Sequence, residues 1–154
     1  MRERVLVTGG AGFLGGYVIA KLIEHGREPV SFDHRRVVLS LFGHARFLGD
    51  VRDRVAVSEA VAGMDGVIHL AGVLGTQETI RNPLPAIETN IQGSLNVFEA
   101  CAERGIPCVY ITVGNYWMEN PYSITKTCAE RFAWMMNQER GGKISVVRAL
   151  NAYG

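Results

Sequence analysis

Tyr122 and Lys126 stand four residues apart in the segment "PYSITK", directly after a proline that is typical of a helix start. Residues i and i+4 share one face of a helix, so both side chains can point into one pocket. A lysine beside a tyrosine suits acid/base chemistry, because the ammonium favours the phenolate. Moving a phenol from its usual pKa to about 7 requires roughly 4 kcal/mol. The alternative is two unrelated residues one turn apart, since both types are common.

A glycine-rich turn, "TGGAGFLGG", separates the apolar run Val5–Val7 from a segment with helical periodicity. In this setting backbone N–H groups and the positive end of the helix dipole can bind a pyrophosphate. We expect Gly9 to permit the tight turn, Gly12 the close approach of the phosphates, and Gly15 the packing of helix against strand. An ordinary flexible turn is the alternative, and the flanking strand and helix favour phosphate binding.

Asp33 ends the next apolar run, eighteen positions beyond Gly15. This is close to the spacing at which an acidic residue binds the adenosine ribose of a dinucleotide. A carboxylate there accepts from the ribose hydroxyls and repels a 2′-phosphate, which favours NAD over NADP. Arg35 and Arg36 argue the other way, because guanidinium groups can bind that phosphate. We prefer to interpret these two arginines as a solvated turn.

Asp50 and Val51 lie in "GDVRD", which follows the third predicted strand. There they can border the adenine of the same dinucleotide. An alternative of almost equal weight is that the aspartate caps the next helix.

These residues are positioned by an alternation of strands and helices. Short apolar runs, several rich in β-branched residues, predict buried strands at Val5–Val7, Pro29–Phe32, Phe47–Leu48, Val67–Ala71, Cys108–Val113 and Ile144–Val147. Helical spacing with glycine stops predicts helices from Leu14 to Gly26 and from Leu84 to Gly105. A third helix should follow Pro121, with a buried stripe of Cys128, Phe132, Met135 and Met136. The alternation predicts an α/β domain, a doubly wound parallel sheet with helices on both faces.

Composition restricts the partners. Of 154 residues, 47% are hydrophobic, which is enough for one domain with a full core. A formal net charge of +1 supplies no basic field for nucleic acid and no polybasic face for a membrane, so neither is an expected partner. No apolar run suits a signal or transmembrane segment, and we expect a cytoplasmic protein. Cys101, Cys108 and Cys128 lack a CxxC spacing and are expected to be buried thiols, with no metal site.

In their order along the chain, these motifs resemble the extended short-chain dehydrogenase/reductase family. The matching segments are TGxxGxxG at 8–15, Asp33, GDV at 49–51, HLAG at 69–72, TN at 89–90, YxxxK at 122–126 and RALNAYG at 148–154. The pattern looks most like the NAD-dependent epimerases and dehydratases of nucleotide sugars. The resemblance covers essentially the whole chain and implies a Rossmann-type NAD(P)-binding domain over residues 1–154.

The resemblance also implies a role for each matching residue. It places Gly9, Gly12, Phe13, Leu14 and Gly15 at the pyrophosphate, Asp33 at the ribose, Asp50 and Val51 at the adenine, and Leu70, Ala71 and Gly72 beneath the nicotinamide. Asn90 joins this cofactor site as a brace between strands, the alternative being a polar contact within its helix. His69 is expected to be a core histidine.

The implied chemistry is oxidation of a sugar hydroxyl. Tyr122 takes the proton, NAD takes the hydride from the same carbon, and Lys126 lowers the pKa of the tyrosine and holds the nicotinamide ribose. The motifs do not specify the sugar, the nucleotide, or whether epimerisation or dehydration follows. A non-catalytic dinucleotide-binding or interaction module is the alternative, and a reductase of another small carbonyl compound is a weaker third option. A homodimer is possible by analogy with the family.

Two features depart from the family pattern. The family usually ends its fifth strand in a serine- or threonine-rich triplet, whereas this strand ends in Thr112, Val113 and Gly114. Thr112 is then the nearest candidate for the catalytic hydroxyl, and an ordinary β-branched strand residue is an equal alternative. The family also continues beyond NxYG into a segment that supplies much of the nucleotide-sugar pocket. We expect that C-terminal substrate segment to be absent here, through truncation in preference to a natural short form.

Overall fold

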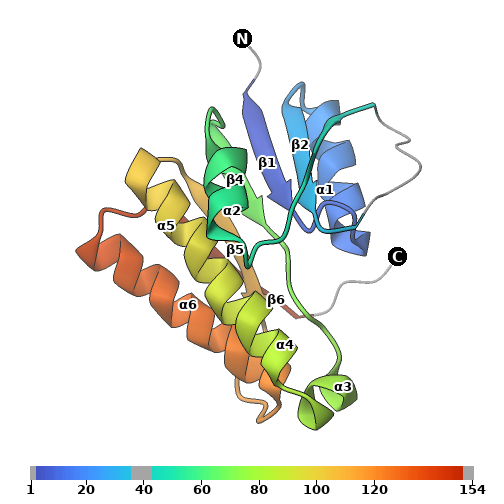
Figure 1. Ribbon diagram of the computed structural model, residues 1–154, viewed down its shortest axis with the longest axis vertical. Coiled ribbons are helices and arrows are strands. Elements are labelled where there is room, and N and C mark those ends of the chain that lie inside the picture. Colours follow the sequence, from blue (N-terminus) through green and yellow to red (C-terminus); the bar gives the residue numbers. More distant parts are fainter. Residues whose placement is uncertain (1–2, 36–42, 151–154) are drawn as a thin grey trace.

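The computed structural model describes residues 3–35 and 43–150, and they form a six-stranded parallel sheet (Figure 1). Its spatial order is β3-β2-β1-β4-β5-β6. The strands are β1 (Arg4–Thr8), β2 (Glu28–Asp33), β3 (Ala45–Leu48), β4 (Gly66–His69), β5 (Cys108–Val113) and β6 (Ile144–Ala149). The chain order reverses between β1 and β4, which pair directly. This reversal is the switch point at which doubly wound sheets bind ligands, and the predicted fold class is confirmed.

Helices cover both faces of the sheet unequally. They are α1 (Phe13–Glu24), α2 (Arg54–Val61), α3 (Thr76–Arg81), α4 (Leu84–Ala86), a π-helical segment η1 (Ile87–Gly93), α5 (Ser94–Arg104) and α6 (Pro121–Glu139). In Figure 1, α1 packs beside β1 and β2, while α2, α5 and α6 form a layer on the other side. The main hydrophobic core lies between that layer and the sheet, where Leu6, Val67, Phe98 and Tyr110 are buried. Each of the six predicted strands is present.

The helix predicted from Leu84 to Gly105 is one continuous helical stretch with a π-helical middle. Gly105 ends it in the left-handed conformation, φ 65°, as the glycine stop predicts. The wider π turn was not predicted, because side-chain periodicity does not report an i→i+5 hydrogen bond. Gly93 is the last residue of η1 and packs against the loop that follows β3. A Cβ atom on Gly93 would lie 2.6 Å from the Cγ2 of Val51.

Helix α2 follows the loop that contains Asp50, but Asp53 is the residue that caps it. The Asp53 carboxylate accepts hydrogen bonds from the N–H groups of Val55 and Ala56, at 2.9 and 3.1 Å. The loop aspartate that caps the next helix is therefore Asp53 and not Asp50. The carboxylate of Asp50 instead accepts from Arg52.

Helix α6 begins where it was predicted, with Asn120 as its N-cap, but it buries a different stripe. Met136 is buried as expected, whereas Cys128, Phe132 and Met135 are only partly buried. The buried side of the helix carries mainly small and polar residues: Ser123, Thr125, Lys126, Ala129, Glu130, Ala133 and Met136. Hydropathy assigns polar residues to the solvent side of a helix. The buried face predicted from the sequence is therefore rotated by part of a turn from the face that α6 buries. Close packing on β5, β6 and η1 requires the small residues.

The three cysteines carry free thiols. Those of Cys101 and Cys108 are buried, as the sequence predicts, whereas that of Cys128 is only partly buried. Across residues 3–35 and 43–150, no helix has both the length and the apolar character needed to span a bilayer.

Candidate functional site

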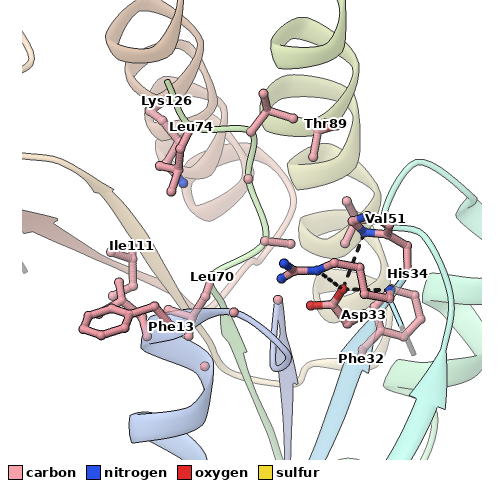
Figure 2. A pocket seen from close by; sticks show the side chains of 18 of the residues that line it. Phe13, Phe32, Asp33, His34, Val51, Leu70, Leu74, Thr89, Ile111 and Lys126 are labelled. Carbon is pink, nitrogen blue, oxygen red and sulfur yellow. Dashed lines mark hydrogen bonds and ion pairs between the residues drawn. The ribbon is translucent and has the colours of Figure 1, made fainter. Parts of the chain in front are cut away.

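A cavity of about 760 Å³ opens at the carboxyl ends of the strands and crosses the switch point between β1 and β4 (Figure 2). Cofactor pockets have volumes of this order. Of the predicted site residues, it is lined by Gly9, Gly12, Phe13, Leu14, Gly15, Asp33, Asp50, Val51, Leu70, Ala71, Gly72, Thr112, Tyr122 and Lys126. Segments more than a hundred residues apart in sequence therefore meet in one cavity.

The glycine turn has the geometry that its sequence predicts. Gly9 adopts φ 69°, and a Cβ atom there would lie 2.8 Å from the backbone nitrogen of Ala71. A Cβ atom on Gly15 would lie 2.4 Å from the carbonyl oxygen of Gly9, so only glycine lets α1 approach the turn this closely. Gly12 stands at the N-cap of α1 with no side-chain cap, which leaves the first-turn N–H groups of the helix directed at the cavity.

Asp33 is surrounded by hydrogen-bond donors (Figure 2). Its oxygens accept from the N–H of Ala11 at 3.1 Å, and from the N–H and Nε of Arg35 at 3.0 and 3.3 Å. Partial burial works to raise the pKa of Asp33, but the hydrogen bonds from Arg35 and Ala11 outweigh it and hold the pKa below its usual value. The carboxylate is thus ionised and fixed to the glycine turn, facing the cavity.

Arg35 is more than the solvated turn residue that we predicted. Its side chain is 56% exposed, yet it lines the cavity and forms an ion pair with Asp33. The sequence could not decide this, because an arginine two residues after a strand can point to either side. Arg36 lies outside the described residues.

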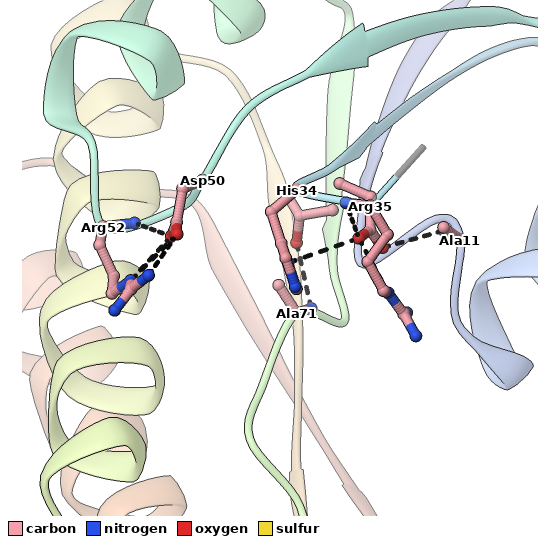
Figure 3. A network of polar contacts seen from close by, with 8 residues as sticks. Ala11, His34, Arg35, Asp50, Arg52 and Ala71 are labelled. Carbon is pink, nitrogen blue, oxygen red and sulfur yellow. Dashed lines mark hydrogen bonds and ion pairs between the residues drawn. The ribbon is translucent and has the colours of Figure 1, made fainter. Parts of the chain in front are cut away.

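Asp50 and Arg52 form a second polar cluster on the cavity wall (Figure 3). Arg52 donates to both oxygens of Asp50, at 2.7 to 3.1 Å, and reaches Glu88 on η1 at 3.1 Å. These hydrogen bonds lower the pKa of Asp50. Behind it, the Nδ2 of Asn96 donates to the carbonyl of Val51 at 2.9 Å, which fixes the backbone at the expected adenine position.

Tyr122 and Lys126 both line the inner part of the cavity, on the first two turns of α6. Lys126 is only 5% exposed, and burial lowers its pKa to about 7. Burial raises the pKa of Tyr122. The neighbouring lysine alone would lower the pKa of Tyr122, but loss of hydration disfavours the phenolate and raises it. A further positive charge in the cavity is needed to bring the pKa of Tyr122 down.

Thr112 lines the cavity, but its hydroxyl is already used. It donates to the carbonyl oxygen of Lys126 at 3.2 Å, so its proton is directed at α6 and away from the cavity. Thr112 lines the cavity as predicted, and its role as the catalytic hydroxyl stays a prediction. Gly114 has no hydroxyl, and a Cβ atom there would lie 2.5 Å from the Cδ2 of Leu150.

Asn90 does not reach the cavity and is fully buried. Its amide accepts from the N–H of Val73 at 2.7 Å and donates to the carbonyl of Val73 and to the Oγ1 of Thr125, at 3.1 and 3.0 Å. The π turn brings this side chain between the loop after β4 and α6. Asn90 thus braces the wall of the cavity without lining it.

His69 is a core histidine, as predicted, and is fully buried. Ser94 donates its only hydroxyl proton to the carbonyl of Asn90 at 2.6 Å, so it must accept from the Nε2–H of His69 at 2.9 Å. The Nδ1 of His69 then accepts from the hydroxyl of Thr8 at 2.6 Å. The imidazole is neutral, and burial followed by repulsion from Lys126 lowers its pKa to about 3.

Sequence reasoning missed most of the rim of the cavity. The additional lining residues include His34, Arg52, Val73, Leu74, Pro85, Ile111, Ala149 and Leu150. Most lie in loops or near strand ends, Pro85 lies in α4, and they carry no shared motif. A signal that could have found some of them is a position within four residues after a predicted strand, which applies to Arg52, Val73 and Leu150.

The fold agrees with comparisons to known proteins. The chain matches the NAD dependent epimerase/dehydratase family over residues 5–114, more than half of its length, and therefore belongs to that family. It is 30% identical to the UDP-N-acetylglucosamine 4,6-dehydratase (inverting) of Campylobacter jejuni, in a match that covers 92% of this chain and 46% of the dehydratase.

Two solved structures show the same fold. The Thermus thermophilus UDP-glucose 4-epimerase, in complex with NAD, has a TM-score of 0.86 and 26% identity over 98% of this chain and 58% of that one. The Thermotoga maritima UDP-glucose 4-epimerase, with UDP-glucose, has a TM-score of 0.90 and 28% identity over 98% of this chain and 56% of that one. The chain thus spans about half the length of these relatives.

Proposed function

We propose that these residues form the cofactor-binding and catalytic half of an NAD-dependent epimerase or dehydratase that acts on a nucleotide sugar. The observation that carries the proposal is the meeting, in one cavity, of the glycine turn, the ionised Asp33 and the pair Tyr122 and Lys126. The C. jejuni relative acts on a UDP-sugar, and the T. maritima relative is solved with one. This favours a nucleoside-diphosphate sugar as the substrate class.

The residues fit a dinucleotide along the length of the cavity. The first turn of α1 offers N–H groups to the pyrophosphate, and Gly12 leaves space for it. Asp33 accepts from the adenosine ribose, and Asp50 with Val51 borders the adenine. At the other end, Leu70, Ala71 and Gly72 form a wall of small and apolar residues, on the side from which Tyr122 and Lys126 enter.

In the proposed reaction Tyr122 removes the proton from a sugar hydroxyl. NAD, when bound, accepts the hydride from the same carbon and adds a positive charge to this end of the cavity. The ammonium of Lys126 also carries a positive charge, which favours the phenolate of Tyr122. The two positive charges together oppose the rise that burial causes in the pKa of Tyr122. Tyr122 then returns the proton when the ketone is reduced on its other face, or holds it while water is lost.

The test is Tyr122→Phe in a single-turnover assay with NAD and UDP-glucose or UDP-N-acetylglucosamine, followed by NADH absorbance. Loss of a general acid/base should slow reduction of NAD by about 10²- to 10⁴-fold. Binding of NAD, measured by calorimetry, should be nearly unchanged. Tyr116→Phe is the matched control, because Tyr116 is half exposed in the loop before α6 and does not line the cavity. Equal rates for both variants would disprove the assignment.

One observation favours a second function, a dinucleotide-binding module without catalysis. At the end of β5, Gly114 has no hydroxyl, and the hydroxyl of Thr112 donates to the carbonyl oxygen of Lys126 on α6. Tight NAD binding with no NADH formed from either UDP-sugar by the unmodified protein would support the module.

A further inference from the structure

Lys126 lies over the face of an aromatic ring. Its Nζ is 4.3 Å from the ring centroid of Tyr110, which is fully buried in β5. No carboxylate of the described residues forms an ion pair with this ammonium. Glu130, one turn along α6, binds Arg148 instead. The ring face of Tyr110 is thus the negative surface that the buried ammonium contacts.

Tyr110 also binds the backbone of the same lysine. Its hydroxyl donates to the carbonyl oxygen of Lys126 at 3.1 Å, beside the bond from Thr112. One side chain therefore contacts both ends of Lys126, the backbone through its hydroxyl and the ammonium through its ring.

The ring of Tyr110 is itself held from below. His69 stacks against it with centroids 5.6 Å apart and an interplanar angle of 24°, and Phe98 meets it edge-on at 5.2 Å. The hydrogen bonds of Thr8 and Ser94 keep the imidazole neutral. This matters because a second positive charge beneath the ring would oppose the ammonium above it. His69, Tyr110 and Lys126 form a column from the core to the cavity.

We propose that Tyr110 is a positioning residue for the reaction, and that its ring holds the Lys126 ammonium at the inner end of the cavity where Tyr122 acts. The proposal rests on the function proposed above for Lys126. A long lysine side chain has several rotatable bonds, and the contact of its ammonium with a fixed ring leaves it few conformations. Without the ring, the ammonium is free to turn outward to water.

The first test is spectroscopic and needs no cofactor. The chain has three lysines, so ¹³C-lysine labelling yields few side-chain signals, and Lys126→Met identifies the one of interest. Ring currents should shift the ε-methylene protons of Lys126 upfield of those of the exposed Lys21 and Lys143. Tyr110→Phe should keep the shift, because it keeps the ring. Tyr110→Leu should abolish it. A Lys126 signal that overlaps the other two in the unmodified protein would overturn the proposal.

The second test separates positioning from stability. Phe47→Leu removes an aromatic ring that packs on the same core, where its ring contacts Phe32, and it leaves the ring beneath Lys126 and its supports intact. In the NADH assay, Tyr110→Leu should reduce the rate by about tenfold, a typical effect of losing one buried cation–π contact. Phe47→Leu should change the rate by less than about twofold. Equal losses in the two variants would mean that Tyr110 has only a structural role.

A trifluorinated phenylalanine at position 110 tests the same point if Tyr110→Leu fails to fold. It retains the ring shape and removes much of the negative potential of its face, so the rate should fall relative to Tyr110→Phe. An unchanged rate would overturn the proposal. If instead Tyr122→Phe leaves NADH formation intact, the proposed function fails, while the position of Lys126 is still read from its ring-current shift.

Discussion

Two buried bases, His69 and Lys126, show how a residue's environment determines its charge. Burial lowers both pKa values, to about 3 and about 7. His69 has two hydrogen-bond partners that suit the neutral imidazole, whereas Lys126 has an aromatic face and an open cavity. The histidine therefore serves the core. The ammonium of Lys126 can contact a ligand bound in the cavity.

This environment predicts a pH dependence of stability. The unfolded chain protonates His69 near pH 6.5, and the folded chain only near 3, so the unfolded state binds more protons between these values. The free energy of unfolding should therefore fall as the pH is lowered through this window, by up to about 1.4 kcal/mol per unit and by about 2 kcal/mol between pH 6.5 and 4.5. Lys126 contributes only above pH 7, outside the window.

Urea denaturation at several pH values measures this slope. His69→Gln should be less stable at pH 7 and lose much less stability on acidification. His25→Gln, at an exposed histidine in the C-cap of α1, should retain the slope of the unmodified protein. Parallel slopes for His69→Gln and the unmodified protein would contradict the prediction.

At the scale of elements, short helices follow the loops that line the cavity. Helix α2 has eight residues and would be marginal alone, so its cap and its packing on α5 determine its stability. The same loop places Asp50 on the cavity wall three residues before the cap. One segment thus combines a residue that starts a helix with a residue that faces the cavity.

Substitution separates these two roles. Asp53→Ala removes the cap of α2 and should lower the free energy of unfolding by about 1 kcal/mol, while Asp53→Asn should retain most of it. Asp50→Ala should change stability by less than about 0.5 kcal/mol, because its ion pair with Arg52 is exposed to solvent. Asp50→Ala should instead weaken NAD binding. Urea denaturation and calorimetry measure the two effects, and the reverse pattern would exchange the roles.

At the scale of the whole molecule, all six strands contribute to the cavity along the edge formed by their carboxyl ends. The loops after β1, β2, β3 and β4 line the cavity together with α6 and the ends of β5 and β6. A ligand along this edge contacts most elements of the sheet at once, and it should therefore stabilise the entire fold.

NAD at about 100 times its dissociation constant should raise the free energy of unfolding by about 2.7 kcal/mol. NADP at the same concentration should raise it less, because Asp33 repels a 2′-phosphate, and Asp33→Ser should reduce the difference. Denaturation with each nucleotide measures both effects. Greater stabilisation by NADP would contradict the role of Asp33 and would identify Arg35 as a phosphate ligand.

The sequence by itself determined the strands, the glycine turn, the start of α6 and about half of the residues that line the cavity. These features depend on local patterns, such as apolar runs, glycine spacing and a cap, and order along the chain assigns their place in a doubly wound sheet. Every predicted site residue except Asn90 reaches the cavity for this reason.

Only the tertiary structure decided the partners of individual polar groups. It directed the hydroxyl of Thr112 to α6, paired Arg35 with Asp33, placed Asn90 behind the wall and set Lys126 on Tyr110. Each of these contacts joins residues whose spacing carries no pattern, or turns a side chain to one of several neighbours. Such choices depend on the distances between packed elements, and a sequence does not contain those distances in readable form.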